Sequence, residues 1–160
     1  MVKVGDKVPS ATLRTMGPEG PKPITTEELF APGKKVVAFA LPGAFTPTCS
    51  AKHVPGFVTE FDKIKAKGVD TIACISVNDA FVMGAWGKDQ NVGDKILMLA
   101  DGSGEFAKAM GLSMDLTKMG MGVRSQRYAM IVKDGKIEQL FAEKPGAFEA
   151  STAENVLKHL

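Results

Sequence analysis

The feature that most constrains the fold is a series of three short apolar runs, each ended by turn-forming residues. The runs are KKVVAFALPG (34–43), VDTIACISVND (69–79) and KILMLADG (95–102). Apolar runs of this length, bounded by glycine, proline or aspartate, indicate buried strands. Stretches of helical character separate them, and strands that alternate with helices predict a sheet with helices packed on its faces.

A helix is predicted between the first two strands. Its apolar stripe repeats at helical spacing and consists of Val54, Phe57, Val58, Phe61 and Ile64. Such a stripe is the face that a helix packs against a sheet. Pro55 lacks a backbone donor, so we expect a kink at this point. Shorter helices are predicted within 78–90 and 103–111.

The last third of the chain predicts a hairpin followed by a helix. In QRYAMIVKDGKIEQLFAE (126–143), two apolar runs are joined through Asp134-Gly135, a pair typical of tight β-turns. In the C-terminal STAENVLKHL, Ser151 and Glu154 have the spacing of a capping box. The whole order of elements favours an α/β protein with a thioredoxin-like fold, in which a central mixed β-sheet is flanked by helices.

The length and charge of the chain indicate its domain number and the kinds of partner it does not favour. The 160 residues are most simply one domain over 1–160, and a net charge of +2 offers no case for nucleic acid or an anionic membrane. No apolar run approaches the length of a bilayer span, and the N-terminal MVKVGDKVPSATL indicates neither a secretory nor a transit peptide. We therefore expect a cytoplasmic protein. The turn-rich TMGPEGPKP (15–23) is predicted to be a surface loop.

The chain has two cysteines, Cys49 and Cys74, which are far apart and not in a C-x-x-C pair. This arrangement indicates neither a disulfide framework nor a zinc site, and no metal or organic cofactor is expected. In a reducing compartment both would be thiols. Composition alone leaves open which of them is reactive.

Cys49 is predicted to lie at the beginning of a helix. In LPGAFTPTCS, Thr46 is a suitable N-cap and Pro47 is favoured at the first helical position. Cys49 then falls in the first turn, where free backbone amides and the positive end of the helix dipole stabilise a thiolate. The Pro42-Gly43 bend would place this turn at the end of a strand, where sites of α/β sheets are found. The alternative is that Cys49 is a small core residue, as most free cysteines are.

Several segments resemble one family in the same order along the chain. PGAFTPTCS followed by KHVPGF is similar to the active-site segment of the peroxiredoxins, in particular the type II (peroxiredoxin-5-like) group. ISVND with the FVM and AW that follow it, LADGSGEFAKAMGL (99–112) and RSQRYAMIVKDG (124–135) resemble the same group. The resemblance spans nearly the whole chain and implies a thiol peroxidase on a thioredoxin-like fold.

The resemblance also implies roles for four residues. Cys49 matches the peroxidatic cysteine, Thr46 its hydroxyl partner, Pro42 the proline that shields the pocket, and Arg127 the catalytic arginine. Arg124 is a less suitable candidate because it lies further from the strand that begins with YAMIV. The chemistry fits these residue types, since a guanidinium that keeps its proton can bind thiolate and peroxide together. The products would be a sulfenic acid on Cys49 and water or an alcohol.

Cys74 lies in TIACISV, the middle of a predicted buried strand, and is a candidate for a packed core thiol. The alternative makes Cys74 the resolving thiol that forms a disulfide with Cys49. In animal members of the related group the resolving cysteine lies near the C-terminus, but FEASTAENVL contains no cysteine. The remaining mechanism resembles that of the plant type II enzymes, in which an external thiol reduces the sulfenic acid. We therefore expect glutathione with glutaredoxin, or thioredoxin, as the reductant.

Two other functions would use the same thiol. His53 follows Cys49 by about one helical turn, and a Cys–His pair would suggest a cysteine hydrolase. The chain lacks the signature of such a cysteine and an orienting Asn or Asp, so we interpret His53 as a structural residue near Pro55. A redox sensor that is oxidised without turnover is the other alternative.

Hydrophobic residues near the proposed site indicate contacts with partners. Phe45 and Phe81 flank the site and are candidates for a pocket wall or a dimer contact. The Met-rich SMDLTKMGMG (113–122) is predicted either to fill gaps under a loop or to form an adaptable docking surface. Related proteins pair near the active site, so the resemblance implies a homodimer that acts on peroxide, without a nucleic-acid or membrane partner.

Overall fold

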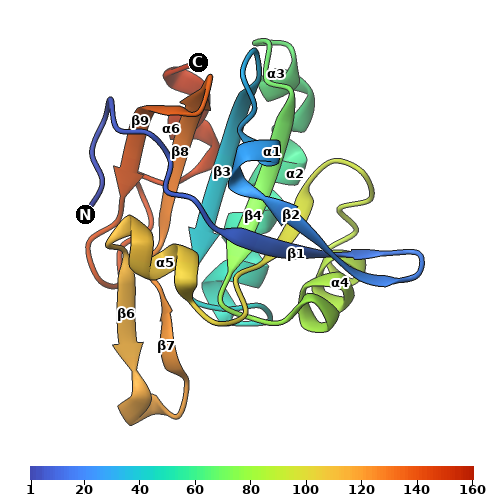
Figure 1. Ribbon diagram of the computed structural model, residues 1–160, viewed down its shortest axis with the longest axis vertical. Coiled ribbons are helices and arrows are strands. Elements are labelled where there is room, and N and C mark those ends of the chain that lie inside the picture. The colour runs from blue at the N-terminus through green and yellow to red at the C-terminus, as the bar shows by residue number, and fades with distance from the viewer.

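The computed structural model describes residues 1–160, and the three apolar runs form strands β3, β4 and β5 as predicted (Figure 1). The strands are β1 (Thr12–Gly17), β2 (Gly20–Thr25), β3 (Lys35–Leu41), β4 (Thr71–Ser76), β5 (Leu97–Ala100), β6 (Ser113–Leu116), β7 (Gly122–Ser125), β8 (Tyr128–Lys133) and β9 (Lys136–Ala142). The α-helices are α1 (Thr26–Leu29), α2 (Val54–Thr59), α3 (Phe61–Lys65), α4 (Ala80–Asp89), α5 (Glu105–Met110) and α6 (Ala153–Lys158). A π-helical turn (Cys49–His53) and a 3₁₀ turn (Thr117–Met119) complete the structure.

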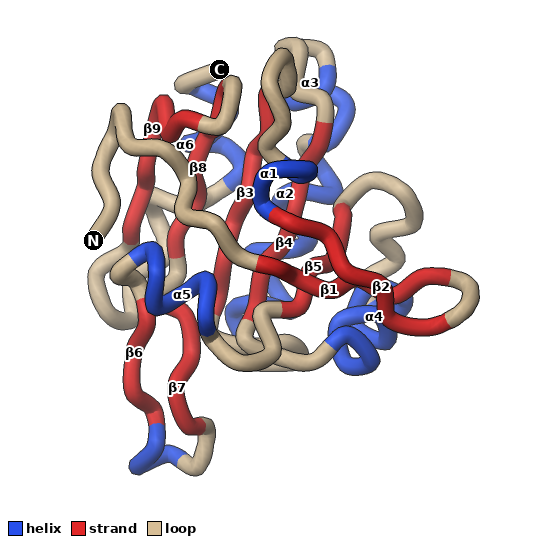
Figure 2. Tube along the Cα trace, viewed as in Figure 1, coloured by secondary structure: helices blue, strands red, loops and turns tan.

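Seven strands form one mixed sheet, in the order β2-β1-β5-β4-β3-β8-β9. The pairs β3-β4 and β4-β5 are parallel, and the other pairs are antiparallel. Every residue of β3 after Lys35 is buried, as expected for a central strand covered on both faces. Helices lie on both faces of the sheet (Figure 2). The predicted central mixed β-sheet flanked by helices is therefore confirmed.

Two apolar clusters lie on opposite faces of this sheet. Successive side chains of a strand point to opposite faces, and β3 divides its residues accordingly. Val37, Phe39 and Leu41 belong to the first cluster, and the residues between them belong to the second. The first cluster is covered by α2, α3, α4 and α6, and the second by α1 and α5. Both candidate cysteines belong to the first cluster.

The helix predicted after β3 is formed in three consecutive segments, the π-helical turn, α2 and α3. Val54, Phe57 and Ile64 are fully buried, which confirms the predicted apolar stripe. A kink was expected at Pro55, and the structure has a wider, π-helical turn immediately before this residue. There the amide of Val54 donates to the carbonyl of Cys49, one residue further back than in an α-helix.

Two hairpins, β1-β2 and β8-β9, form the two edges of the sheet. The second was predicted and the first was not. Asp134 (φ 53°) and Gly135 (φ 76°) make the predicted tight turn between β8 and β9, with both residues in the left-handed region. The surface loop predicted at 15–23 is wrong, because most of this segment belongs to the β1-β2 hairpin. Its prolines are tolerated because β2 is the edge strand, where a missing amide removes no bond to a further strand.

The capping box predicted at Ser151 is also wrong. The helix α6 is capped one residue later by Thr152, whose hydroxyl accepts from the amide of Asn155 at 3.1 Å. The amide and hydroxyl of Ser151 instead donate to the carboxylate of Glu143, at 2.8 and 2.7 Å. A distant carboxylate therefore takes the donors that the local pattern assigns to the cap.

The Met-rich segment forms the small β6-β7 sheet, a hairpin that projects from the body of the molecule (Figure 1). Met119 lies near its tip and is 72% exposed, so the expectation that this methionine fills a gap is wrong. Across the chain, no helix combines the length and the apolar character needed to span a membrane.

Candidate active site

Cys49 lies where the chain leaves the carboxyl end of β3 and begins a helix. The chain bends at Pro42, and the helical backbone begins at Pro47. The amide of Ser50 donates to the carbonyl of Thr46 at 2.9 Å, which closes the first helical turn. The predicted start of the helix is confirmed, and Cys49 occupies its first turn.

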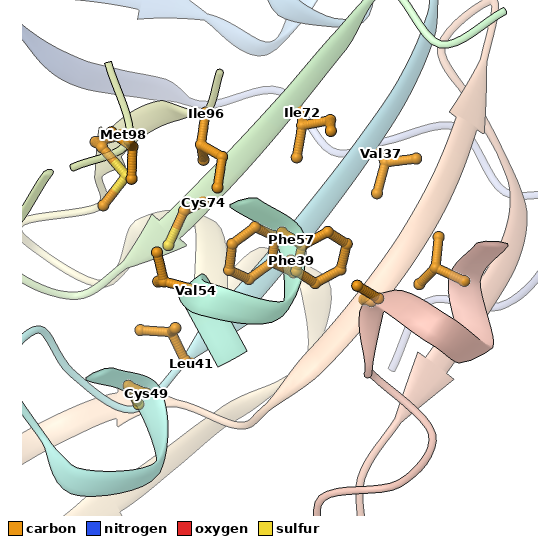
Figure 3. Close-up of a cluster of buried hydrophobic side chains, with 14 of the residues drawn as sticks. Val37, Phe39, Leu41, Cys49, Val54, Phe57, Ile72, Cys74, Ile96 and Met98 are labelled. Carbon is orange, nitrogen blue, oxygen red and sulfur yellow. The ribbon is translucent and has the colours of Figure 1, made fainter. Parts of the chain in front are cut away.

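The sulfur of Cys49 is buried and yet contacts a charged side chain. Cys49 is 0% exposed and packs in the apolar cluster that contains Leu41 and Val54 (Figure 3). Arg127 Nη2 donates to Cys49 Sγ at 3.2 Å. The two residues meet because β8 runs antiparallel to β3, so that the residue preceding Tyr128 lies beside the end of β3. The guanidinium therefore places a fixed positive charge within hydrogen-bonding distance of the sulfur.

Arg127 is held in place by His53. Arg127 Nη1 contacts His53 Nδ1 at 2.8 Å, and a guanidinium can only donate, so the ring nitrogen is the acceptor. The other ring nitrogen, Nε2, then carries the proton and donates to the carbonyl of Ser151 at 3.0 Å. Burial, together with the charge of Arg127, lowers the pKa of His53 to about 3. The imidazole is therefore neutral at physiological pH.

This geometry excludes the Cys–His pair of a hydrolase. Both ring nitrogens of His53 are engaged, one by Arg127 and one by Ser151, and neither bonds to Cys49. The ring also packs against Phe39, with centroids 4.8 Å apart. The interpretation of His53 as a structural residue agrees with these contacts, although it contacts Arg127 rather than simply filling the kink at Pro55.

A loop after β9 completes the support of Arg127, and sequence reasoning missed it. The ring of Phe148 lies 5.7 Å from the Arg127 guanidinium and 5.1 Å from the His53 ring. Glu143 closes the loop, because one of its oxygens accepts from the amides of Glu149 and Ser151 and from the Ser151 hydroxyl. Burial alone would raise the pKa of Glu143, but these hydrogen bonds outweigh it and lower the pKa. No local pattern in the sequence connects this loop with Arg127.

The hydroxyl of Thr46 does not cap the helix, contrary to prediction. Its Oγ1 donates to the carbonyl of Gly43 at 2.7 Å. A hydroxyl has a single proton, so the Thr46 oxygen has lone pairs left to accept a hydrogen bond but no proton to donate to the sulfur. Of the two roles that a threonine hydroxyl could play here, the structure leaves that of acceptor.

Of the other residues singled out in the sequence, Pro42 lies at the bend before the site, and Phe45 and Phe81 are exposed. Pro42 lies at the bend, where its carbonyl accepts from Arg124 Nη1 at 3.2 Å. Phe45 and Phe81 are 53% and 62% exposed, so neither is buried against the sulfur. Trp86, which the sequence analysis did not single out, is fully buried, and its indole donates to Ser50 Oγ at 3.0 Å.

Cys74 has a different environment from Cys49. It lies in the middle of β4, is 0% exposed and forms no disulfide. Leu41 and Val54 are drawn between the two sulfur atoms in the view of Figure 3. Burial raises the pKa of the Cys74 thiol well above its usual range, which leaves it protonated and a poor nucleophile. No cluster of three or more His, Cys, Asp or Glu side chains is arranged to hold a metal ion.

Comparison with known proteins agrees with this geometry. The family model described as Redoxin matches residues 3–157. Peroxiredoxin-2E, chloroplastic, of Arabidopsis thaliana is 51% identical over 163 residues, which cover 99% of this chain and 69% of the relative. The crystal structure of reduced Prx3 from Vibrio vulnificus in complex with H₂O₂ is 53% identical and superimposes with a TM-score of 0.95, covering 99% of each chain. The 1-Cys peroxiredoxin of Plasmodium falciparum is 34% identical, with a TM-score of 0.91, and covers 99% of this chain and 98% of that one.

The chain therefore belongs to the Redoxin family. Within it, the similarity to peroxiredoxins over nearly the whole length identifies a type II peroxiredoxin on a thioredoxin-like fold. Its activity is that of a thiol-dependent peroxidase, an oxidoreductase.

Proposed function

We propose that the protein reduces hydrogen peroxide and organic hydroperoxides through a sulfenic acid on Cys49. The observation that carries this proposal is the 3.2 Å contact between Arg127 Nη2 and Cys49 Sγ. In the reaction, the sulfur forms a bond to the terminal peroxide oxygen and the O–O bond breaks. The electron pair leaves on the other oxygen, which takes a proton and departs as water or an alcohol.

Arg127 is the residue that stabilises the charge in this step. Negative charge moves from the sulfur to the departing oxygen, and a fixed guanidinium with several donors can contact both. His53 and Phe148 hold its plane, so little reorganisation is needed when the peroxide binds. Thr46 accepts a hydrogen bond from the O–H of the peroxide, because its own proton is engaged by Gly43. Pro42 shields the site from water at the bend after β3.

An external thiol, either glutathione with glutaredoxin or thioredoxin, reduces the sulfenic acid. Two observations support this part of the proposal. Cys74 is buried in the centre of the sheet, and its raised pKa disfavours attack on Cys49. The relative from Plasmodium falciparum, which is described as a 1-Cys peroxiredoxin, is an example of the family with one participating cysteine.

Trapping the oxidised cysteine tests the assignment. One equivalent of hydrogen peroxide is added to the reduced protein in the presence of a sulfenic acid trap such as dimedone, and the modified peptides are identified by mass spectrometry. We expect the label on the peptide containing Cys49 and none on the peptide containing Cys74. Label on Cys74, or an intramolecular disulfide in place of the label, would contradict the proposal. Turnover assays with the two reductant systems then identify the reductant, and oxidation without turnover in either would favour a redox sensor.

A homodimer is part of the same proposal. The rings of Phe45 and Phe81 are exposed and provide apolar surface for a second copy of the chain. Light scattering should show a dimer that becomes a monomer when both rings are replaced by serine. The cytoplasmic location and the single domain over residues 1–160 stay predictions from the sequence.

A further inference from the structure

Arg124 has no part in the proposed chemistry, yet its side chain lies against the segment that carries Thr46. Its Nη1 donates to the carbonyl of Pro42 at 3.2 Å, and its Nε donates to the carbonyl of Met121 at 2.9 Å. No carboxylate pairs with it, since the one ion pair of the chain joins Lys63 and Glu60. The guanidinium therefore connects two backbone segments, the bend after β3 and the β6-β7 hairpin.

The contact between Arg124 and the bend requires the glycine at position 43. A Cβ atom on Gly43 would lie 2.7 Å from Arg124 Nη1 and 3.3 Å from Thr46 Cγ2. Because the φ angle of Gly43 is not in the left-handed region, the need for glycine here comes from close approach. The guanidinium thus packs directly on the residue whose carbonyl accepts the Thr46 hydroxyl.

The segment between Gly43 and Thr46 is strained and depends on its anchors. Phe45 has a φ angle of 64°, a conformation that costs a non-glycine residue about 1–2 kcal/mol. The amide of Ala44, in the same segment, donates to Asn78 Oδ1 at 2.9 Å. Arg124 and Asn78 therefore hold the bend from two different parts of the fold.

We propose that Arg124 is a positioning residue for peroxide reduction and acts through Thr46. By holding Pro42 and Gly43, it keeps the Gly43 carbonyl where it takes the Thr46 proton, so that the lone pairs of Thr46 face the peroxide. This inference rests on the role proposed above for Thr46. It assigns the two arginines distinct tasks, since Arg127 contacts the sulfur and Arg124 contacts the backbone that orients the hydroxyl.

A double-mutant cycle tests the coupling. The second-order rate constant for oxidation of Cys49 by hydrogen peroxide is measured by stopped flow, with the fluorescence of Trp86, which bonds to Ser50 beside Cys49, as the signal. We expect Thr46→Val and Arg124→Met each to lower the rate constant about tenfold, and the double variant to be no slower than Thr46→Val alone. Independent effects would multiply instead, and that result, or a wild-type rate for Arg124→Met, would overturn the inference.

Gly43→Ala provides a second cycle on the same contact. The added methyl group displaces the guanidinium in the wild-type background, so we expect a slower oxidation comparable to that of Arg124→Met. In the Arg124→Met background the methyl group no longer meets the guanidinium and keeps only its 3.3 Å contact with Thr46 Cγ2, so the further loss should be smaller than in the wild-type background. An equal loss in both backgrounds would count against the contact. Circular dichroism verifies the fold of each variant, and Arg124→Gln replaces the methionine variant in both cycles if the latter fails to fold.

The cycles also separate this inference from the proposed function. A wild-type rate in Thr46→Val would remove the role of Thr46, and the inference about Arg124 would fall with it. A slow Thr46→Val combined with an independent effect of Arg124→Met would remove the inference alone.

Discussion

The two cysteines are equally buried, but only Cys49 has a guanidinium in contact with its sulfur. Both are 0% exposed and belong to the same apolar cluster. Cys49 lies at the end of a strand, where Arg127 from the neighbouring β8 reaches the sulfur. Cys74 lies in the middle of β4, where the side chains facing it are apolar (Figure 3).

Under the proposed function, burial alone does not make a thiol inert. Removal from water disfavours the charged form of any thiol, and at Cys74 this effect outweighs the opposing charge of Arg127, so its pKa rises. At Cys49 a guanidinium donates to the sulfur, and its position is fixed by His53, Phe148 and the loop closed by Glu143. We infer that reactivity depends on a position beyond the carboxyl end of a central strand, where a polar side chain of the neighbouring strand can reach the sulfur.

The strongest test of this comparison is to remove each thiol in turn. Cys49→Ser should lower peroxidase turnover by more than about a thousandfold, because the hydroxyl cannot replace the sulfur as nucleophile. Cys74→Ala should retain turnover with an external thiol. Both are measured by following peroxide consumption at saturating reductant. Comparable losses in the two variants would show that Cys74 takes part in the cycle.

The next largest effect is expected for the charge beside Cys49. Arg127→Lys should lower the rate of Cys49 oxidation about a hundredfold, since an ammonium group cannot donate to His53, sulfur and peroxide in one plane. Arg14→Lys, on the exposed face of β1, is the matched control and should oxidise at the wild-type rate. If Arg127→Lys matched the control, a point charge would suffice and the planar geometry would be irrelevant.

The network behind Arg127 should be visible as a pH dependence of stability. Above pH 6.5 His53 is neutral in both states, but below it the unfolded chain binds a proton that the folded protein cannot bind until about pH 3. Stability is therefore lost as the pH falls, by about 2 kcal/mol between the usual histidine pKa and about pH 5. His53→Gln, which can still accept from Arg127 and donate to Ser151, should lack this part of the loss.

Urea denaturation of the wild type and of His53→Gln, at about pH 6.5 and at about pH 5, measures how much stability each protein loses between the two pH values. Titration of Glu143 and other carboxyl groups is common to both proteins, so it cancels when they are compared. Equal losses in the wild type and in His53→Gln would mean that His53 can be protonated in the folded state.

The last test compares how serine at each of the two cysteine positions changes the stability of the fold. Cys74→Ser should lower the free energy of unfolding by about 1–3 kcal/mol, because the centre of β4 offers its hydroxyl no partner. Cys49→Ser should cost less, since the new hydroxyl can accept the hydrogen bond from Arg127. Thermal unfolding at neutral pH measures both variants, and a larger loss for Cys49→Ser would contradict the proposed difference between the sites.

Much of the fold could be predicted because its signals are local. The three apolar runs, the stripe on Val54, Phe57 and Ile64, and the Asp134-Gly135 turn all act within a few residues of themselves. One error occurred where a distant partner changed the outcome, since Glu143 took the donors of Ser151 that a capping box would use. The other was local, because the two ends of the Pro-rich 15–23 segment pair with each other in the β1-β2 hairpin.

The parts of the site that depend on local sequence could also be predicted. The start of the helix at Pro47 and the position of Cys49 in its first turn follow from local residue types. The preference for Arg127 over Arg124 as the arginine at the sulfur was also predicted. The contacts of His53 and the contact of Arg124 with the bend could not be predicted, because each depends on residues of a distant part of the chain. Spacing along the chain does not say which carbonyl a guanidinium will reach.

By itself, the order of residues determined the central strands, the main helices and which thiol stands at a helix start, because backbone preferences and apolar periodicity operate over short distances. The tertiary structure alone decided that this thiol has a cation within hydrogen-bonding distance and the other has none. That choice depends on the antiparallel pairing of β3 with β8, which brings together residues that are 78 positions apart.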